Sequence, residues 1–227
     1  MKRIILILLI FCFTSFSQSK DPNVILNKVK EKFNTVKDYV VDVKIKIDVE
    51  FIKAPVTEAK IYFKQPDKIH FESENFALLP KEGINFSPSA LLKDNYTAVY
   101  SKEDTVDGFK TSVVKVIPLN EQSKIVLTTL WIDQKDELIR KIETTAKTGG
   151  TFSIELKYNN NFNYPLPSHM EFNFNVDRMN IPQGINSDLQ EDKKRSNGEK
   201  RSGKVIIDYS NYKINEGIPD RIFEEKK

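Results

Sequence analysis

A strict alternation of apolar and charged side chains between Tyr39 and Phe51 is the feature that most limits how this chain can fold. The apolar residues are Tyr39, Val41, Val43, Ile45, Ile47, Val49 and Phe51, and mainly charged residues stand between them. Side chains on a strand alternate between its two faces, whereas a helix would spread this pattern around its whole surface. The stretch therefore predicts a long strand with one apolar and one charged face.

The next segment predicts a hairpin that buries the same face. Ile61 and Phe63 precede a turn at Gln65-Pro66-Asp67, and Ile69 and Phe71 follow it. Proline presets φ and aspartate tolerates turn geometry, so this tripeptide suits the joint between two strands. Both strands of the hairpin then present their apolar residues to one side.

Strands continue to the end of the chain. They are expected at residues 96–101, 111–117, 124–132, 137–145, 151–158, 168–176 and 205–212, with turn residues such as Asp107-Gly108 between them. Short strands with tight connections indicate an antiparallel meander. We expect a mainly β (α+β) fold, in which roughly ten strands form a single antiparallel sheet curled into an incomplete β-barrel.

An amphipathic helix is expected ahead of the sheet. Asp21 suits the N-cap position and Pro22 the first helical position. The apolar stripe consists of Ile25, Val29, Phe33 and Val36. This spacing predicts a helix of about four turns with one packed and one solvated side.

The first residues indicate an exported protein. Lys2 and Arg3 precede an apolar run over residues 4–13, and the small residues Ser15 and Ser17 follow it. These are the three parts of a secretory signal peptide, and we place it at residues 1–17. Residues 18–227 are then expected to form one soluble periplasmic domain, acting as a monomer.

Cys12 leaves an alternative open, in which the protein is a lipoprotein anchored to a membrane through this cysteine. An acylated cysteine normally follows a very small residue at the end of the apolar run. Here the large residue Phe11 precedes Cys12, and the cysteine lies inside the run, so we interpret it as part of the discarded peptide. Residues 18–227 then contain no cysteine, which excludes disulfides and thiol chemistry. They also contain 33 basic and 32 acidic residues, a balance that argues against a nucleic-acid partner.

Two segments fit neither a helix nor a strand pattern. Residues 75–95 are apolar but interrupted by Pro80, Gly83 and Pro88, and we interpret them as a lid folded over the sheet. The lid candidates are Phe76, Leu78, Leu79, Ile84, Phe86, Leu91 and Leu92. Residues 177–204 carry charges of both signs and are interpreted as a polar, flexible loop, with a basic arm such as Lys193-Lys194-Arg195, for a partner or anionic headgroups, as the alternative.

The motifs of catalysis and of metal or cofactor binding are missing from the sequence. The two histidines, His70 and His169, lie far apart in separate predicted strands and lack partners spaced like a zinc site or a hydrolase triad. A glycine-rich phosphate loop is also absent. We therefore expect no catalytic residues, no metal and no cofactor.

The apolar side of the sheet supplies the candidates for a lipid cavity. They are Val41, Val43, Ile45, Ile47, Val49, Ile61, Phe63, Ile69, Phe71, Phe152, Ile154, Leu156, Phe172 and Phe174. These residues either make a dry core with the helix or leave apolar surface for a ligand, because one helix covers only part of so large a sheet.

Several short motifs resemble the LolA-like superfamily of outer-membrane lipoprotein-sorting and lipoprotein carrier proteins. They are the helix ending at Val36-Lys37-Asp38-Tyr39, the hairpin around Lys64-Gln65-Pro66-Asp67-Lys68, Asp107-Gly108 before Val113 to Pro118, Leu130-Trp131-Ile132-Asp133 leading to Leu138-Ile139-Arg140-Lys141-Ile142, and Asn163 to Phe174. The resemblance implies an incomplete barrel with a helical lid and an apolar cavity that shields acyl chains in transit through the periplasm.

Two positions depart from the family. The resemblance implies an arginine before the hairpin proline that latches the lid, and many relatives carry another arginine where His70 stands. This chain has Gln65 at the latch position, and its amide can donate a hydrogen bond but cannot make the charged, forked contact of arginine.

Three functions follow as hypotheses. The first is a periplasmic carrier that binds acyl chains of a lipoprotein or lipid and contacts a membrane surface transiently. The second is a non-carrying envelope interaction or sensor module with the same fold and a filled core, which would bind envelope proteins. The third is a hydrolase built on this scaffold.

Overall fold

A computed structural model describes residues 20–49, 55–73, 92, 95–148, 150–159, 163–175 and 202–224. The predicted signal peptide lies outside these residues, and so do residues 177–201 of the predicted loop. Of the lid candidates, Phe76, Leu78, Leu79, Ile84, Phe86 and Leu91 also lie outside. Leu92 is described, and it is buried in the core.

Helix α1 (Pro22–Phe33) begins as its sequence predicts. The side chain of Asp21 accepts a hydrogen bond from the backbone N–H of Asn23, and Pro22 takes the first helical position. The helix ends at Phe33 rather than at Val36, so its 12 residues make about three turns. Asn34 and Thr35 are weak helix formers, and the chain must turn there to enter the first strand.

The predicted strands are all present. They are β1 (Asp38–Val49), β2 (Thr57–Lys64), β3 (Lys68–Glu72), β4 (Tyr96–Val106), β5 (Phe109–Pro118), β6 (Ile125–Asp133), β7 (Ile139–Ala146), β8 (Thr151–Lys157), β9 (His169–Asn175) and β10 (Ser202–Ile214). A short 3-10 helix, η4 (Asp220–Phe223), follows β10.

Several strands are longer than the alternation indicated, β4 and β10 by the most residues. β4 continues past Ser101 to Val106, because it stays paired with β5 up to the tight turn at Asp107-Gly108, whose residues both have positive φ. β10 begins at Ser202, so residues 202–204 belong to the sheet and not to the predicted loop. Pairing with β9 supplies the hydrogen bonds that extend it.

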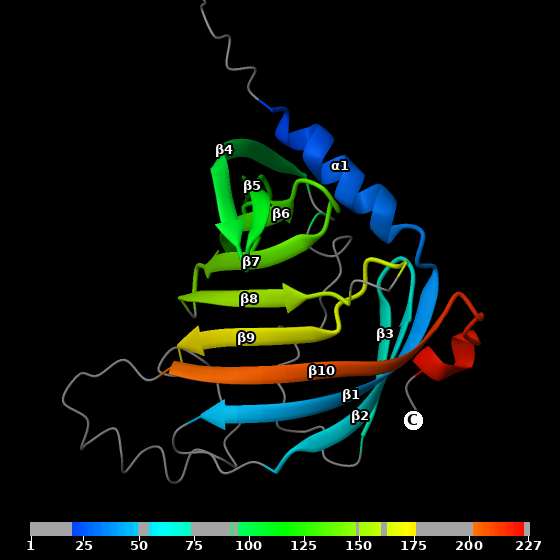
Figure 1. Ribbon diagram of the computed structural model, residues 1–227. Helices are drawn as coiled ribbons and strands as arrows, with labels where there is room; N and C mark the ends of the chain where they lie inside the picture. Colours follow the sequence, from blue (N-terminus) through cyan, green and yellow to red (C-terminus); the bar gives the residue numbers. More distant parts are fainter. Residues whose placement is uncertain are drawn as a thin grey trace, which may run out of the picture.

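The strands form one antiparallel sheet in the order β3-β2-β1-β10-β9-β8-β7-β6-β5-β4. The expectation of a single meander is wrong in one respect, since β1 pairs with β10, the last strand of the chain. Strands β3 and β4, consecutive in the sequence, therefore lie at opposite edges. The sheet curls without closing, because its ends bend towards each other but do not pair (Figure 1).

Helix α1 lies across the opening of the curled sheet (Figure 1). At one end of the sheet, the ring of Phe33 meets that of Phe63 on β2 edge to face, with centroids 5.7 Å apart. At the other end, Lys30 Nζ lies 3.3 Å from the hydroxyl of Tyr96 on β4. The helix thus bridges the two ends of the sheet, and its buried residues Leu26, Val29 and Phe33 fill part of the space inside.

Gly203 is a point of close packing in the sheet. It pairs with Val49 on β1 and with Phe174 on β9, and the Phe174 ring lies over its backbone. A Cβ atom at Gly203 would come within 2.6 Å of Phe174 Cε2 and 2.9 Å of Val49 Cγ2. At these distances the Phe174 ring and the Val49 side chain would have to shift to admit a methyl group.

We therefore expect Gly203→Ala to lower the free energy of unfolding by about 1–3 kcal/mol, the usual range for overpacking. Chemical denaturation measures this change. Combining it with Phe174→Leu removes the clashing ring atoms and is expected to recover part of the loss. A Gly203→Ala protein as stable as the wild type would contradict the packing described.

Candidate functional site

The predicted cavity residues all lie on the inner face of the sheet, towards α1. Buried among them are Val41, Val43, Ile45, Val49, Ile61, Phe63, Ile154, Leu156 and Phe172. Half-buried against the core are Ile47, Ile69, Phe71, Phe152 and Phe174. The structure extends this face with residues that the sequence reasoning did not select, namely Val114, Val116, Leu130, Ile132, Ile142, Met170, Val205 and Ile207.

A group of phenylalanine rings lies on β8 and β9 in a less buried part of the inner face. Phe172 lies 5.4 Å from Phe152 and 5.2 Å from Phe174, measured between ring centroids. Phe172 is buried, whereas Phe152 and Phe174 are only half-buried. Rings on β8 and β9 therefore offer apolar surface that the protein does not fully cover.

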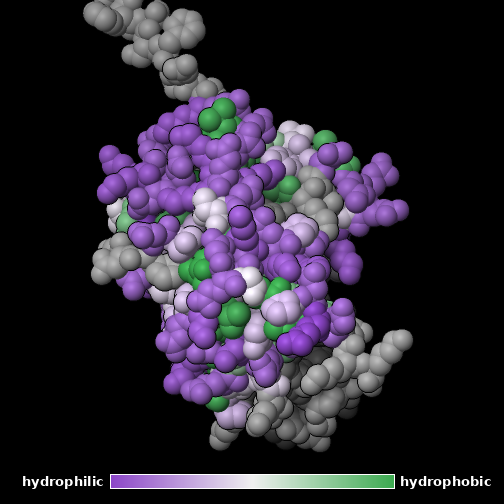
Figure 2. Space-filling model, turned by 90° about the vertical axis from the view of Figure 1, so that its right-hand side faces the viewer, coloured by the Kyte–Doolittle hydropathy of each residue, from purple (hydrophilic) through white to green (hydrophobic). Residues whose placement is uncertain are grey.

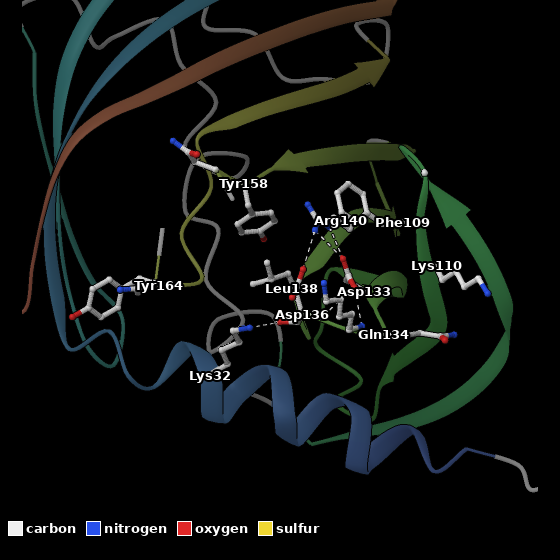
Figure 3. Close-up of a pocket in the computed structure, with 14 residues that line it drawn as sticks. Lys32, Phe109, Lys110, Asp133, Gln134, Asp136, Leu138, Arg140, Tyr158 and Tyr164 are labelled. Atoms are coloured by element: carbon white, nitrogen blue, oxygen red, sulfur yellow. Dashed lines mark hydrogen bonds and ion pairs between the residues drawn. The ribbon is translucent and has the colours of Figure 1, made fainter. Parts of the chain in front are cut away.

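A second feature is a pocket of about 820 Å³ beneath α1 (Figure 3). Its walls come from the last turn of α1, the β4–β5 turn, the β6–β7 turn and the segment after β8. The lining residues are Lys32, Gly108, Phe109, Lys110, Asp133, Gln134, Lys135, Asp136, Leu138, Arg140, Tyr158, Asn159, Asn163 and Tyr164.

A buried ion pair forms the floor of this pocket. Asp133 Oδ2 accepts hydrogen bonds from Arg140 Nε at 3.1 Å and from Arg140 Nη2 at 2.8 Å. The Arg140 guanidinium lies 3.6 Å from the centroid of the Phe109 ring and 5.3 Å from that of Tyr158. Both charged side chains are almost fully enclosed, at 6% and 3% exposure for Arg140 and Asp133.

Backbone N–H groups of the turn between β6 and β7 also donate hydrogen bonds to Asp133. Its Oδ1 accepts the backbone N–H groups of Lys135 at 2.9 Å and Asp136 at 3.1 Å. Burial alone would raise the pKa of Asp133, but the bonds from Arg140 and from the two backbone groups outweigh it, so the pKa is lowered. The carboxylate is therefore ionised at neutral pH and holds both the turn and the arginine.

Tyrosine side chains connect the pocket to the core. Tyr158 and Tyr164 line the pocket and also pack against the hydrophobic core. The Tyr158 hydroxyl donates to the Ile139 carbonyl at 2.9 Å, and that of Tyr212 donates to the Pro167 carbonyl at 2.8 Å. Burial raises the pKa of Tyr158 and of Tyr212, so these two hydroxyls are neutral at physiological pH.

Lysines of α1 fasten the helix over the pocket. The Lys32 amine donates to the backbone carbonyl of Asp136, and Lys28 forms an ion pair with Glu137 at 2.9 Å. In Figure 3 the Lys32 side chain points from α1 towards Asp136. One wall of the pocket is thus held by contacts between the helix and the β6–β7 turn.

Gln65, the predicted latch position, lies beside the end of α1. Its side-chain amide donates to the Val36 carbonyl at 2.8 Å, and its backbone N–H donates to the Lys37 carbonyl at 2.8 Å. Gln65 therefore ties the β2–β3 hairpin to the α1–β1 connection. Its role as a lid latch stays a prediction, because most of the lid candidates lie outside the described residues.

The two histidines belong neither to the group of phenylalanine rings nor to the lining of the pocket beneath α1. His169 is next to carboxylates, with Nδ1 2.6 Å from Asp208 Oδ1 and Nε2 3.4 Å from Glu171 Oε1. His70 packs against the ring of Tyr62 at 5.8 Å. No group of three or more metal-ligating side chains is found in the part of the chain that the structure describes.

The sequence reasoning did not select Asp133 and Arg140 as site residues, although both belong to the motifs that carry the family resemblance. One available signal was an aspartate at the start of a turn, where its side chain often binds backbone N–H groups. A second signal was an arginine next to Ile139 in a strand with a buried face. The stacking of Phe109 and Tyr158 on that arginine had no local signal.

The molecule's surface is mainly hydrophilic on the side shown in Figure 2, where the coloured hydrophobic residues form small separate patches. Among the described residues, no helix has the length and apolar character needed to cross a membrane.

Comparison of the fold with solved structures finds several similar chains. A DUF1329 family protein from Desulfovibrio piger superposes with a TM-score of 0.56 at 12% identity, covering 90% of this chain and 98% of that one. A LolA superfamily protein from Nitrosomonas europaea gives 0.54 at 13% identity, with 90% and 97% covered. An outer membrane lipoprotein-sorting protein domain from Vibrio parahaemolyticus gives 0.55 at 10% identity, with 89% and 97% covered.

Sequence comparisons add no relative, since no family model and no curated protein matches the chain. At these identities the structural matches establish the fold alone. They confirm that the chain has a LolA-like fold, which the short motifs indicated.

Proposed function

We propose, from the LolA-like fold of this chain, that the protein binds the acyl chains of a lipid or lipoprotein and carries them between membranes without catalysis. The proposal includes export to the periplasm by the signal peptide at residues 1–17, with sorting of outer-membrane lipoproteins as the process served. The similarity to a lipoprotein-sorting domain supports this assignment.

The accessible phenylalanine rings on β8 and β9 are the observation that carries the proposal. Phe152 and Phe174 belong to the apolar inner face of an open sheet, yet both are only partly buried. Burying one methylene group is worth about 0.8 kcal/mol, so an acyl chain gains several kcal/mol by lying along such a surface. A carrier needs this gain because its cargo would otherwise stay in the membrane.

Uptake of a fluorescent fatty acid by the purified protein tests the proposal. We expect Phe152→Ala combined with Phe174→Ala to weaken binding at least about tenfold, because the two rings supply apolar contact area. The matched control is Leu119→Ala combined with Val126→Ala, since these apolar residues are 61% and 47% exposed and lie outside the core. Thermal unfolding of each variant separates lost binding from lost folding.

A second candidate, the non-carrying interaction module, is favoured by one observation. The centre of the inner face is filled by the protein itself, since Leu26, Val41, Leu130 and Ile207 are all fully buried. If the wild-type protein takes up no fatty acid and carries no lipid when purified from an envelope fraction, the carrier function is wrong. The interaction module then explains the fold better.

A further inference from the structure

The pocket beneath α1 has a charge and a position that the acyl-chain site does not require. We infer that it holds an anionic headgroup, a phosphate or a carboxylate, of the lipid whose acyl chains lie along the inner face. This inference rests on the proposed carrier function and adds a class of lipid to it. It also gives a role to residues outside the predicted cavity.

Basic groups outnumber acidic groups on the pocket wall. The basic residues are Lys32, Lys110, Lys135 and Arg140, and the acidic residues are Asp133 and Asp136. Asp133 is already neutralised by Arg140 and by the N–H groups of its own turn. Asp136 Oδ2 also lies 3.8 Å from Arg140 Nη2, and with both carboxylates counted the four basic residues still leave the pocket wall with a surplus of positive charge, which favours an anion.

Other parts of the wall suit a phosphate or carboxylate group. Lysine amines and the side-chain amide of Asn163 are N–H donors, and anionic oxygens accept strong hydrogen bonds from such groups. Lys110 and Lys135 are exposed at the rim, and the Lys110 side chain, which points away from the pocket in Figure 3, has to swing round to bring its amine to a ligand. A volume of about 820 Å³ holds a headgroup together with water, within the usual range for ligand pockets.

The pocket also adjoins the apolar interior. Tyr158 and Tyr164 have one side on the pocket and pack against the core cluster, which contains the inner-face residues. Figure 3 shows both rings between the Arg140 region and the opposite wall of the sheet. An amphipathic ligand with its charge among the lysines would pass its chains by the two tyrosines towards the partly buried rings of Phe152 and Phe174, at the far ends of β8 and β9.

The test compares two labelled lipids with the same acyl chains, phosphatidylglycerol and diacylglycerol, which differ in the charged headgroup. The variant is Lys110→Gln combined with Lys135→Gln. We expect its affinity for phosphatidylglycerol to fall about 3- to 10-fold at low salt, while its affinity for diacylglycerol stays unchanged. In the wild type, the preference for phosphatidylglycerol should diminish as salt is added.

The control is Lys46→Gln combined with Lys213→Gln, which removes the same charge from exposed positions on β1 and β10. If both double variants weaken phosphatidylglycerol binding equally, only the overall charge matters and the pocket is not the site. If both lipids bind and the pocket variant changes neither affinity, the inference is overturned while the carrier function stands. If neither lipid binds the wild type, the carrier function and the inference both fail.

Glycerol 3-phosphate distinguishes a lipid headgroup from a small soluble anion. We expect it to bind the wild type more than a hundredfold more weakly than phosphatidylglycerol, because it lacks the acyl chains. Comparable affinities for the two compounds, lost together in the Lys110→Gln and Lys135→Gln variant, would assign the pocket to a soluble phosphate compound instead.

Discussion

Replacing Asp133 by asparagine is expected to lower the free energy of unfolding by about 3–5 kcal/mol, the usual cost of removing one member of a buried ion pair. The substitution keeps the size of the side chain but leaves the Arg140 guanidinium, only 6% exposed, with the more distant and more exposed Asp136 carboxylate, 3.8 Å away, as its remaining counter-ion. It also places an amide N–H group or a neutral oxygen where Arg140 Nε and Nη2 now donate. Urea denaturation of the two proteins measures the difference.

The matched control adds Arg140→Met to the Asp133 variant. Methionine fills part of the space beside Phe109 and Tyr158 without a charge, so the double variant should be more stable than Asp133→Asn alone. If the unfolding free energy of Asp133→Asn lies within about 1 kcal/mol of that of the wild type, the prediction is wrong and water reaches the ion pair and weakens it.

The same pair gives a pH dependence whose sign follows from the pKa of Asp133. This pKa is lower in the folded protein than the ordinary value of 3.8, so the ionised form favours the folded state. The contribution is complete above pH 3.8 and is lost as the pH falls through the lower, folded-state pKa. The difference in stability between the wild type and Asp133→Asn should therefore be constant near neutrality and shrink in acid.

Phe63→Ala is the second substitution with a large expected effect, a loss of about 3–5 kcal/mol of unfolding free energy. Phe63 is 1% exposed and stacks on Tyr39 with ring centroids 5.0 Å apart. Its ring also meets Phe33 of α1, so the cavity left by alanine lies where the helix joins the sheet. Faster amide hydrogen exchange in α1 than in β7 and β8 should accompany the loss.

Phe71→Ala is the matched control for this prediction. Phe71 lies on the neighbouring edge strand β3, on the same face, but is only half-buried. Removing its ring leaves less enclosed space, so the loss of stability should be clearly smaller. Equal losses for the two variants would contradict the burial difference between them.

The strands and the hairpin around Gln65-Pro66-Asp67 could be predicted because the alternation of side chains is a local property. The predicted positions of the strand ends were less accurate. β4 continues through polar residues to Val106 because its neighbour β5 supplies the hydrogen bonds, whatever the polarity of the side chains. The helix was predicted to run to Val36, which is buried but lies beyond the helix end at Phe33.

The candidate site was predicted in part. The inner-face residues followed from the alternation, and those that were selected lie on one face in the structure. The pocket was not predicted, because its walls come from positions as far apart as Lys32 and Asp136. Side chains that meet across such a separation leave no repeating pattern in the sequence.

By itself, the sequence determined an antiparallel sheet with one apolar face, an amphipathic helix ahead of it and the positions of the main turns. Only the tertiary structure decided that β1 joins β10, that α1 bridges the two ends of the open sheet and that a basic pocket forms beneath the helix. The physical reason is that any two strands with an apolar face can pair. The arrangement that forms is selected by the sum of many packing contacts between distant residues, which no local pattern contains.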